Sequence, residues 1–412
     1  IYFIAVAIAF FLPADVSLGF GLGPFLWALV VGILSTLFGI PMNGTLEGRS
    51  MWLGVNCRAF VVFGACVGLF IMLLYTGRHY YVNLFRGAFL KEKEPVEVYE
   101  RWAARAVIFL FPAMVCYLAV IAHIPWLYAF LYVLISLIGS IVTARVIAET
   151  GLFHIQIMMF PCVLAWGFFG VRAIGLQHLL IMQLVSMVLL IDPREKLMPF
   201  VVNSLKLGEK ESVKTGKLGL GMLAALIVGL AVALPVTLYL QYRFGLTNDG
   251  WAERMVPQFG FDNAASLKNR LQGQGLTLFD EKGAPGPALV GEGLRTLSPV
   301  KYVLPAFAGG LAITLLFSIL RLRLSWWPLH PIMFALWATN HMPHFALSFL
   351  IGWFLKIIIM QYGGARMVDK VKPIMFGFMA GEILGAFLPC VVGIITWMIT
   401  GKMPAVFRIL PG

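Results

Sequence analysis

The chain contains 412 residues, of which 60% are hydrophobic and only 12% are charged, and its formal net charge is +12. Because soluble domains carry about 25% charged residues, this composition excludes a water-exposed globular protein and indicates a polytopic membrane protein. The basic residues lie in short loops between apolar runs and not on a soluble module, so we expect no nucleic-acid partner. The five cysteines are scattered without metal-ligand spacing, and we expect free thiols.

A membrane-spanning helix needs about 20 apolar residues. On that criterion the sequence predicts an all-α transmembrane helical bundle of about twelve membrane-embedded segments. They lie near residues 1–12, 24–41, 57–76, 103–123, 126–148, 157–172, 174–191, 218–242, 300–320, 325–340, 344–362 and 373–399. Those near 1–23, 157–172 and 325–340 are short, and we expect them to be broken or re-entrant. The chain opens with Ile1 inside an apolar run, so we expect residues upstream of it to be missing.

The basic residues predict how these segments are oriented. They gather in the connections 77–105 and 192–217, at Arg321 and Arg323, and near residues 366–372. The predicted segments place all four groups on one side of the membrane, which the positive-inside rule assigns to the cytoplasm. The loop 247–299 then lies on the opposite side, as a small and mostly irregular cap between two membrane helical regions, 1–246 and 300–412.

Charged residues inside apolar segments are the first candidate functional groups, because burying a charge in lipid costs several kcal/mol unless it is paired or hydrated. Arg145 and Glu149 are four residues apart, so on a helix they share a face and can form an ion pair. Gly151 offers a break directly after them, and His154 follows. Such a pair at a helix break is typical of a discontinuous transporter helix, but it would equally end a span at the cytoplasmic surface.

Glu382 lies about ten residues into the run 373–399, which puts it about 15 Å deep at 1.5 Å per residue. A carboxylate at that depth either couples to proton movement or forms a structural hydrogen bond to a neighbouring helix, and the sequence leaves both roles open. Lys356 on the preceding span either extends to the headgroups or acts as a counter-ion for Glu382.

Three histidines flank another short apolar piece. His330 lies in the proline-containing segment 326–331, and His341 and His344 follow on either side of Pro343. Prolines at this spacing forbid a regular helix, and irregular backbone at membrane depth is tolerated only where it faces protein or a watery cavity. No third or fourth ligand stands nearby, so we expect polar lining of a cavity and neither a metal site nor a bound cofactor.

The order of several motifs resembles that of a bacterial polytopic membrane family of unknown function, which is itself distantly similar to oligopeptide transporters. These motifs are Pro13-Ala14-Asp15-Val16-Ser17, the residues 144–151, the basic stretch 206–217, Trp326-Trp327-Pro328-Leu329-His330-Pro331, and Tyr362-Gly363-Gly364 ahead of Lys372-Pro373. The resemblance implies secondary transport of small peptides or metal chelates and a place in the bacterial inner membrane.

Two functional hypotheses follow. In the first, the chain is a proton- or cation-coupled secondary transporter with Arg145, Glu149, His330 and Glu382 lining a midplane site. In the alternative, it is a non-transporting membrane scaffold or a subunit of a larger complex, which the 14% aromatic content would suit. An intramembrane enzyme that acts on lipid would use the same His and Glu residues, with lipid beside His341 and His344, and is a third hypothesis. No hydrolase or nucleotide-binding motif occurs, however, and we predict no enzyme.

We expect the partners to be the lipid bilayer, a small-molecule substrate, and either further copies of the chain or other membrane subunits.

Overall fold

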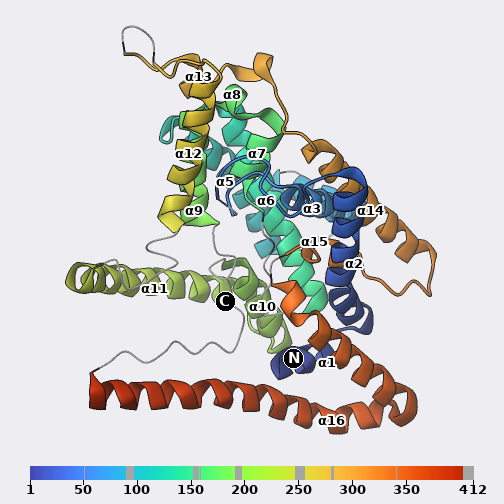
Figure 1. Cartoon of the computed structure of the whole chain (residues 1–412). Coiled ribbons are helices and arrows are strands. Elements are labelled where there is room, and N and C mark those ends of the chain that lie inside the picture. Colours follow the sequence, from blue (N-terminus) through green and yellow to red (C-terminus); the bar gives the residue numbers. More distant parts are fainter. Residues whose placement is uncertain are drawn as a thin grey trace. The chain divides into compact units, whose positions relative to one another are not determined.

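The computed structural model describes residues 1–50, 52–89, 97–151, 157, 159–190, 197–245, 256–279, 283–339 and 341–401. Within these ranges the chain is helical and contains no strand, only two isolated β-bridges, Glu47 with Val55 and Phe279 with Pro285 (Figure 1). The predicted all-α class is therefore confirmed.

The helices are named here in chain order. They are α1 (Phe3–Phe11), α2 (Ala14–Phe38), α3 (Cys57–Thr76), α4 (Arg78–Phe89), α5 (Val98–Val120), α6 (Trp126–Thr150), α7 (Pro161–Phe169), α8 (Val171–Ile174), α9 (Leu176–Leu189), α10 (Leu197–Lys210), α11 (Thr215–Phe244), α12 (Val256–Gly273), α13 (Pro287–Val290), the 3₁₀ helix η3 (Gly293–Thr296), α14 (Val303–Arg323), α15 (Met333–Leu336) and α16 (Met342–Thr400).

Seven helices of the described residues are long and apolar enough to cross a membrane: α2, α3, α5, α6, α11, α14 and α16. An integral membrane protein is thereby supported, but the predicted number of about twelve segments is not confirmed. The difference lies in the short pieces, because the predicted segments 157–172 and 174–191 form α7, α8 and α9, which contain 9, 4 and 14 residues. Gly170 and Gly175, with φ of 81° and 88°, interrupt the helical ladder between them.

The last two predicted segments, 344–362 and 373–399, run together in α16. One residue inside α16 has non-helical dihedrals, Gly364, with φ of 64° and ψ of −173°. α16 therefore consists of two helices, 342–363 and 365–400, and Figure 1 shows the sharp bend between them. A positive φ at this point favours glycine, since other residues pay a steric penalty there.

The chain divides into two compact units. Unit 1 comprises Ile1–Thr36 and Thr314–Gly412, and unit 2 comprises Leu37–Ile313. In unit 1, α1 packs along α16, and their contact is built around the buried side chains of Ala7, Phe10 and Met375.

In unit 2, α3 and α14 approach each other through glycines. A Cβ atom on Gly64 would lie 2.2 Å from the carbonyl oxygen of Phe307, and one on Gly310 would lie 2.1 Å from that of Val61. Only the absence of side chains at both positions allows the two backbones to come this close, as is common between membrane helices.

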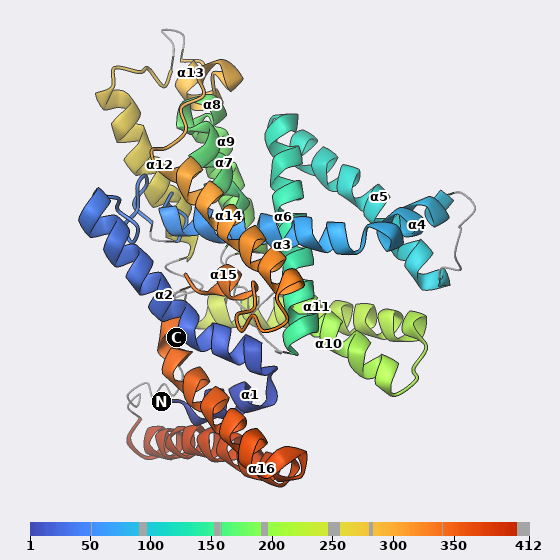
Figure 2. The same cartoon turned by 90° about the vertical axis from the view of Figure 1, so that its right-hand side faces the viewer.

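The region 247–299, predicted to be mostly irregular, contains an 18-residue helix, α12. Polar residues are spread along α12, but its apolar residues Val256, Leu267 and Leu271 are buried. α12 packs against α9 of the same unit. Figure 2 shows α12 beside α9 and α13 in unit 2.

Candidate functional site

A break between α1 and α2 creates the first candidate site, within unit 1. α1 ends at Phe11, and Pro13 separates it from α2 because proline has no backbone N–H with which to continue the hydrogen-bond ladder. α1 spans only 9 residues, so many of its backbone groups lie in a first or last turn and need partners outside the helix.

Side chains of α16 supply partners at both ends of α1. The carboxylate of Glu382 accepts a hydrogen bond of 2.5 Å from the backbone N–H of Ile4, in the first turn. The ammonium of Lys356 donates to the backbone carbonyl of Leu12, directly after the last turn. A negative group at the N-terminus of a helix and a positive group at its C-terminus both interact favourably with the helix dipole. The hydrogen bond to Glu382 leaves both roles predicted for this residue open.

The start of α2 carries a further charge. Asp15, in the first turn of α2, forms an ion pair of 2.9 Å with Arg321 of α14, in the part of α14 that belongs to unit 1. Glu382 and Lys356 therefore bind the two ends of α1, and Arg321 binds Asp15 in the first turn of α2. We call Asp15, Arg321, Lys356 and Glu382 the charged break.

The three histidines of unit 1 lie on the irregular segment before α16 and at its beginning. His330 is 8% exposed, and its Nδ1 accepts a hydrogen bond of 3.2 Å from the backbone N–H of Ile332. His341 is the N-cap residue of α16 and is half-buried, whereas His344 is exposed. Among the described residues, no three His, Cys, Asp or Glu side chains lie close enough together to hold a metal ion.

Arg145 and Glu149 form the predicted ion pair on α6, in unit 2. Their side chains are 53% and 27% exposed. α6 ends at Thr150, and Gly151 follows in the left-handed conformation, so the helix stops where the sequence predicts a break. His154 lies outside the described residues. Arg145 and Glu149 thus belong to a different unit from His330, His341, His344 and Glu382.

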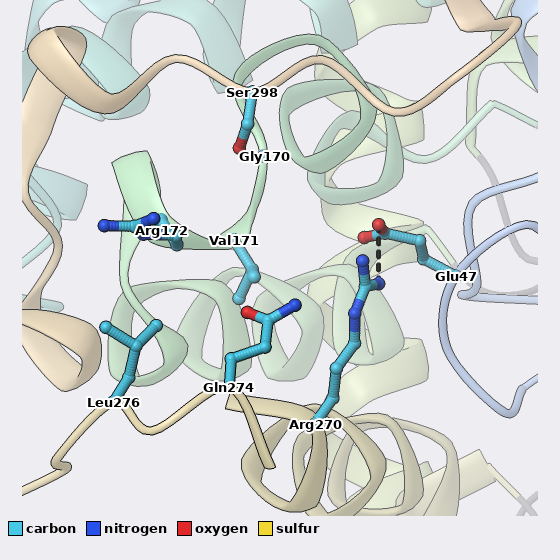
Figure 3. A pocket seen from close by; sticks show the side chains of 8 residues that line it. All are labelled: Glu47, Gly170, Val171, Arg172, Arg270, Gln274, Leu276 and Ser298. Carbon is cyan, nitrogen blue, oxygen red and sulfur yellow. Dashed lines mark ion pairs between the residues drawn. The ribbon is translucent and has the colours of Figure 1, made fainter. Parts of the chain in front are cut away.

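A second candidate site is a pocket in unit 2, with a cavity volume of about 370 Å³ (Figure 3). Four separate parts of the chain line it: the loop after α2, the junction of α7 and α8, the end of α12, and the segment before α14. The lining residues are Glu47, Gly170, Val171, Arg172, Arg270, Gln274, Leu276 and Ser298.

Ion pairs fix the charged side chains of this pocket. Arg270 Nη1 lies 2.6 Å from Glu47 Oε1, and the other oxygen of Glu47 accepts a hydrogen bond of 3.0 Å from the indole N–H of Trp166. Arg172 forms a separate ion pair of 3.1 Å with Glu292. The pocket therefore presents a carboxylate and a guanidinium side by side, and each is held in place by the chain.

Buried Asn263 on α12 brings the lining segments together. Its side-chain oxygen accepts hydrogen bonds from the backbone N–H groups of Arg49 (2.8 Å) and Ser50 (2.9 Å), and its amide donates to the carbonyl of Leu53 at 3.1 Å. These three bonds attach α12, and with it Arg270, to the loop that carries Glu47. The sequence does not predict this pocket, because its residues are distant in the chain and no local spacing signals the role of Asn263.

The sequence matches the model of a family described as a family of unknown function (DUF6785) over residues 1–277 and 294–404. No curated protein and no solved structure matches the chain. The matched ranges include every residue that lines the pocket and every residue of the charged break. The predicted similarity to oligopeptide transporters is not supported by these matches and stays a prediction.

Proposed function

The chain belongs to the family of unknown function DUF6785, in line with the predicted resemblance to an uncharacterised membrane family, and we propose that it is a proton- or cation-coupled secondary transporter. The proposed substrates are small peptides or metal chelates, the class that the resemblance to oligopeptide transporters implies. The proposed location is the bacterial inner membrane, with the basic loops in the cytoplasm.

One observation carries this proposal: Glu382 and Lys356, both on the apolar helix α16, bind the two ends of the short helix α1. Ionisable residues within apolar spans are costly, and in membrane proteins they commonly mark ion or substrate pathways. Discontinuous helices whose ends meet charged groups are the usual way in which secondary transporters build such sites. The break at Pro13 and the irregular segment that carries His330 provide backbone of this kind.

Uptake into proteoliposomes tests the proposal. The purified full chain would be reconstituted, and uptake of a peptide mixture and of metal chelates would be followed with and without a pH gradient. We expect gradient-dependent uptake that E382Q abolishes, because the amide can still accept the Ile4 hydrogen bond but cannot carry a proton.

K370Q provides the matched control. Lys370 is an exposed lysine of the same helix α16, so its replacement removes one positive charge without touching the charged break. We expect K370Q to transport like the wild type and K356Q to lose uptake. Absence of uptake for all substrates, or equal uptake by E382Q and wild type, would contradict a coupled transporter.

A non-transporting scaffold is the alternative function. One observation favours it: no residue in the most apolar 18-residue window of α11 is buried inside the chain. Lipid tails or a partner helix would cover that surface. Purification in native lipid that yields a partner at fixed stoichiometry, together with no uptake in the reconstituted assay, would favour the scaffold over the transporter.

A further inference from the structure

We propose that the pocket of unit 2 binds a small zwitterion, a molecule that carries both a carboxylate and an ammonium group, such as a free α-amino acid or a short peptide. No residue of the charged break lines this pocket, so its occupancy can be measured whether or not the chain transports anything. The topology predicted from the basic loops places this pocket on the extracytoplasmic side.

The first argument is the pairing of opposite charges at one place on the wall. Glu47 and Arg270 both line the pocket and lie 2.6 Å apart. A ligand with only a carboxylate would meet the negative charge of Glu47, and a ligand with only an ammonium would meet Arg270. A molecule that carries both groups can satisfy both side chains at once, as in any complementary pair of charges.

The second argument is that both side chains keep hydrogen-bonding capacity. A guanidinium has five N–H donors, and the Glu47 contact occupies Nη1 of Arg270. A carboxylate accepts about four hydrogen bonds, and Glu47 receives one from Arg270 and one from Trp166. The Arg270 side chain is 49% exposed, so a ligand carboxylate can reach its remaining N–H groups without displacing Glu47.

Uncharged polar groups complete the site. Gln274 follows Arg270 by four residues, and its backbone N–H donates to the Arg270 carbonyl at 3.1 Å, so both side chains leave the same side of this last turn. Figure 3 shows the Gln274 amide between Arg270 and Val171, with Ser298 across the pocket. Within the described part of the chain, neither the Gln274 amide nor the Ser298 hydroxyl has a protein partner. They are therefore available to a ligand.

Size and shape fit a small ligand. The volume of about 370 Å³ falls at the lower end of the range of about 300–1,000 Å³ for small-molecule sites. Val171 and Leu276 add apolar wall, which suits an aliphatic side chain. Gly170 has a φ of 81°, and a Cβ there would lie 2.4 Å from Ser298 Oγ, so this part of the wall depends on glycine.

Equilibrium binding tests the proposal with four ligands. The full chain in lipid nanodiscs would be titrated calorimetrically with leucine, leucylglycine, N-acetylleucine and leucinamide. We expect leucine or leucylglycine to bind, and the tighter of the two identifies a free amino acid or a peptide as the source. Each blocked form should bind at least about tenfold more weakly, because it lacks one charge-assisted hydrogen-bonding group.

Two variants of the lining, Q274A and E47Q, and one control, Q272A, test which residues are responsible. Q274A should weaken binding of the zwitterion several-fold, whereas Q272A, at an exposed position at the end of α12 that does not line the pocket, should bind like the wild type. E47Q keeps an oxygen for Trp166 but loses its charge, so it should weaken leucine binding without weakening N-acetylleucine. Thermal unfolding of each variant would verify that it is folded.

Several results would overturn the proposal. No binding of either zwitterion is one, equal affinity for leucine and both blocked forms is another, and indistinguishable affinities of folded Q274A and Q272A are a third. These outcomes are separate from the transport assay: uptake that depends on Glu382 with no binding at the pocket would leave the transporter proposal intact. Binding at the pocket with no uptake would support the zwitterion site and contradict the transporter proposal.

Discussion

At the scale of single residues, the hydrogen bonds of Asn263 have the clearest energetic consequence. This side chain is fully buried and binds the backbone N–H groups of Arg49 and Ser50 and the carbonyl of Leu53. An apolar side chain at this position could neither accept from the two N–H groups nor donate to the carbonyl. The free-energy cost of a substitution therefore includes the cost of leaving backbone groups without hydrogen bonds, in addition to the bonds that are lost.

We expect N263A to lower the free energy of unfolding by roughly 2 kcal/mol or more, because the backbone N–H groups of Arg49 and Ser50 lose their partner, whereas the Leu53 carbonyl keeps a hydrogen bond of 3.3 Å from Gln183. Thermal unfolding of the purified protein measures this loss. The control is N269A, since Asn269 is exposed on the same helix and its replacement should change stability by about 0.5 kcal/mol at most. Equal midpoints for the two variants would show that the Asn263 bonds do not hold α12.

At the scale of helices, α14 carries two adjacent glycines with different surroundings, and only one of them faces α3. Gly310 faces the backbone of Val61, whereas its neighbour Gly309 has nothing within 4 Å of the place a Cβ would take. The same chemical change at adjacent positions therefore has opposite consequences.

We expect G310A to destabilise the protein by roughly 1–3 kcal/mol, because the new methyl group would push the two backbones apart. G309A should be neutral or stabilising by up to about 1 kcal/mol, since alanine is the better helix former. Thermal unfolding in a single detergent compares them, and a G310A protein as stable as G309A would argue against this helix crossing.

The helices also show what the sequence could predict. Long apolar runs gave α3, α6 and α11 with bounds within a few residues, because the length needed to cross lipid is a strong constraint. The sequence does not predict α12, since polar residues surround its buried Leu267 and Leu271 and no apolar run marks the helix. The pocket was missed for a different reason: it depends on tertiary contacts between Asn263 and the loop after α2, which leave no local pattern.

At the scale of the whole molecule, the order of spans predicts sidedness. α11 is the candidate span between the basic region 206–217 and the cap helix α12, and α14 is the candidate span between the cap and Arg323. If α11 and α14 each cross the membrane once, the cap lies on the side opposite both basic groups. The positive-inside rule then predicts an extracytoplasmic cap.

Cysteine labelling tests this topology. In a background without the five native cysteines, K268C on α12 should react with a membrane-impermeant maleimide in intact cells. K210C, at the end of α10, should react only after the membrane is permeabilised. Labelling of both positions in intact cells, or of K210C alone, would contradict the orientation.

The two hydrogen bonds that hold α1 determine which residues a comparison of related sequences would find restrained. Glu382 and Lys356 bind the amide of Ile4 and the carbonyl of Leu12, groups that every residue except proline provides in full. Substitutions of the Ile4 or Leu12 side chain other than to proline would therefore leave both attachments in place. Sequence restraint that comes from these two bonds should therefore fall on Lys356 and Glu382 of α16, whereas Ala7 and Phe10 of α1 are restrained by their packing against α16.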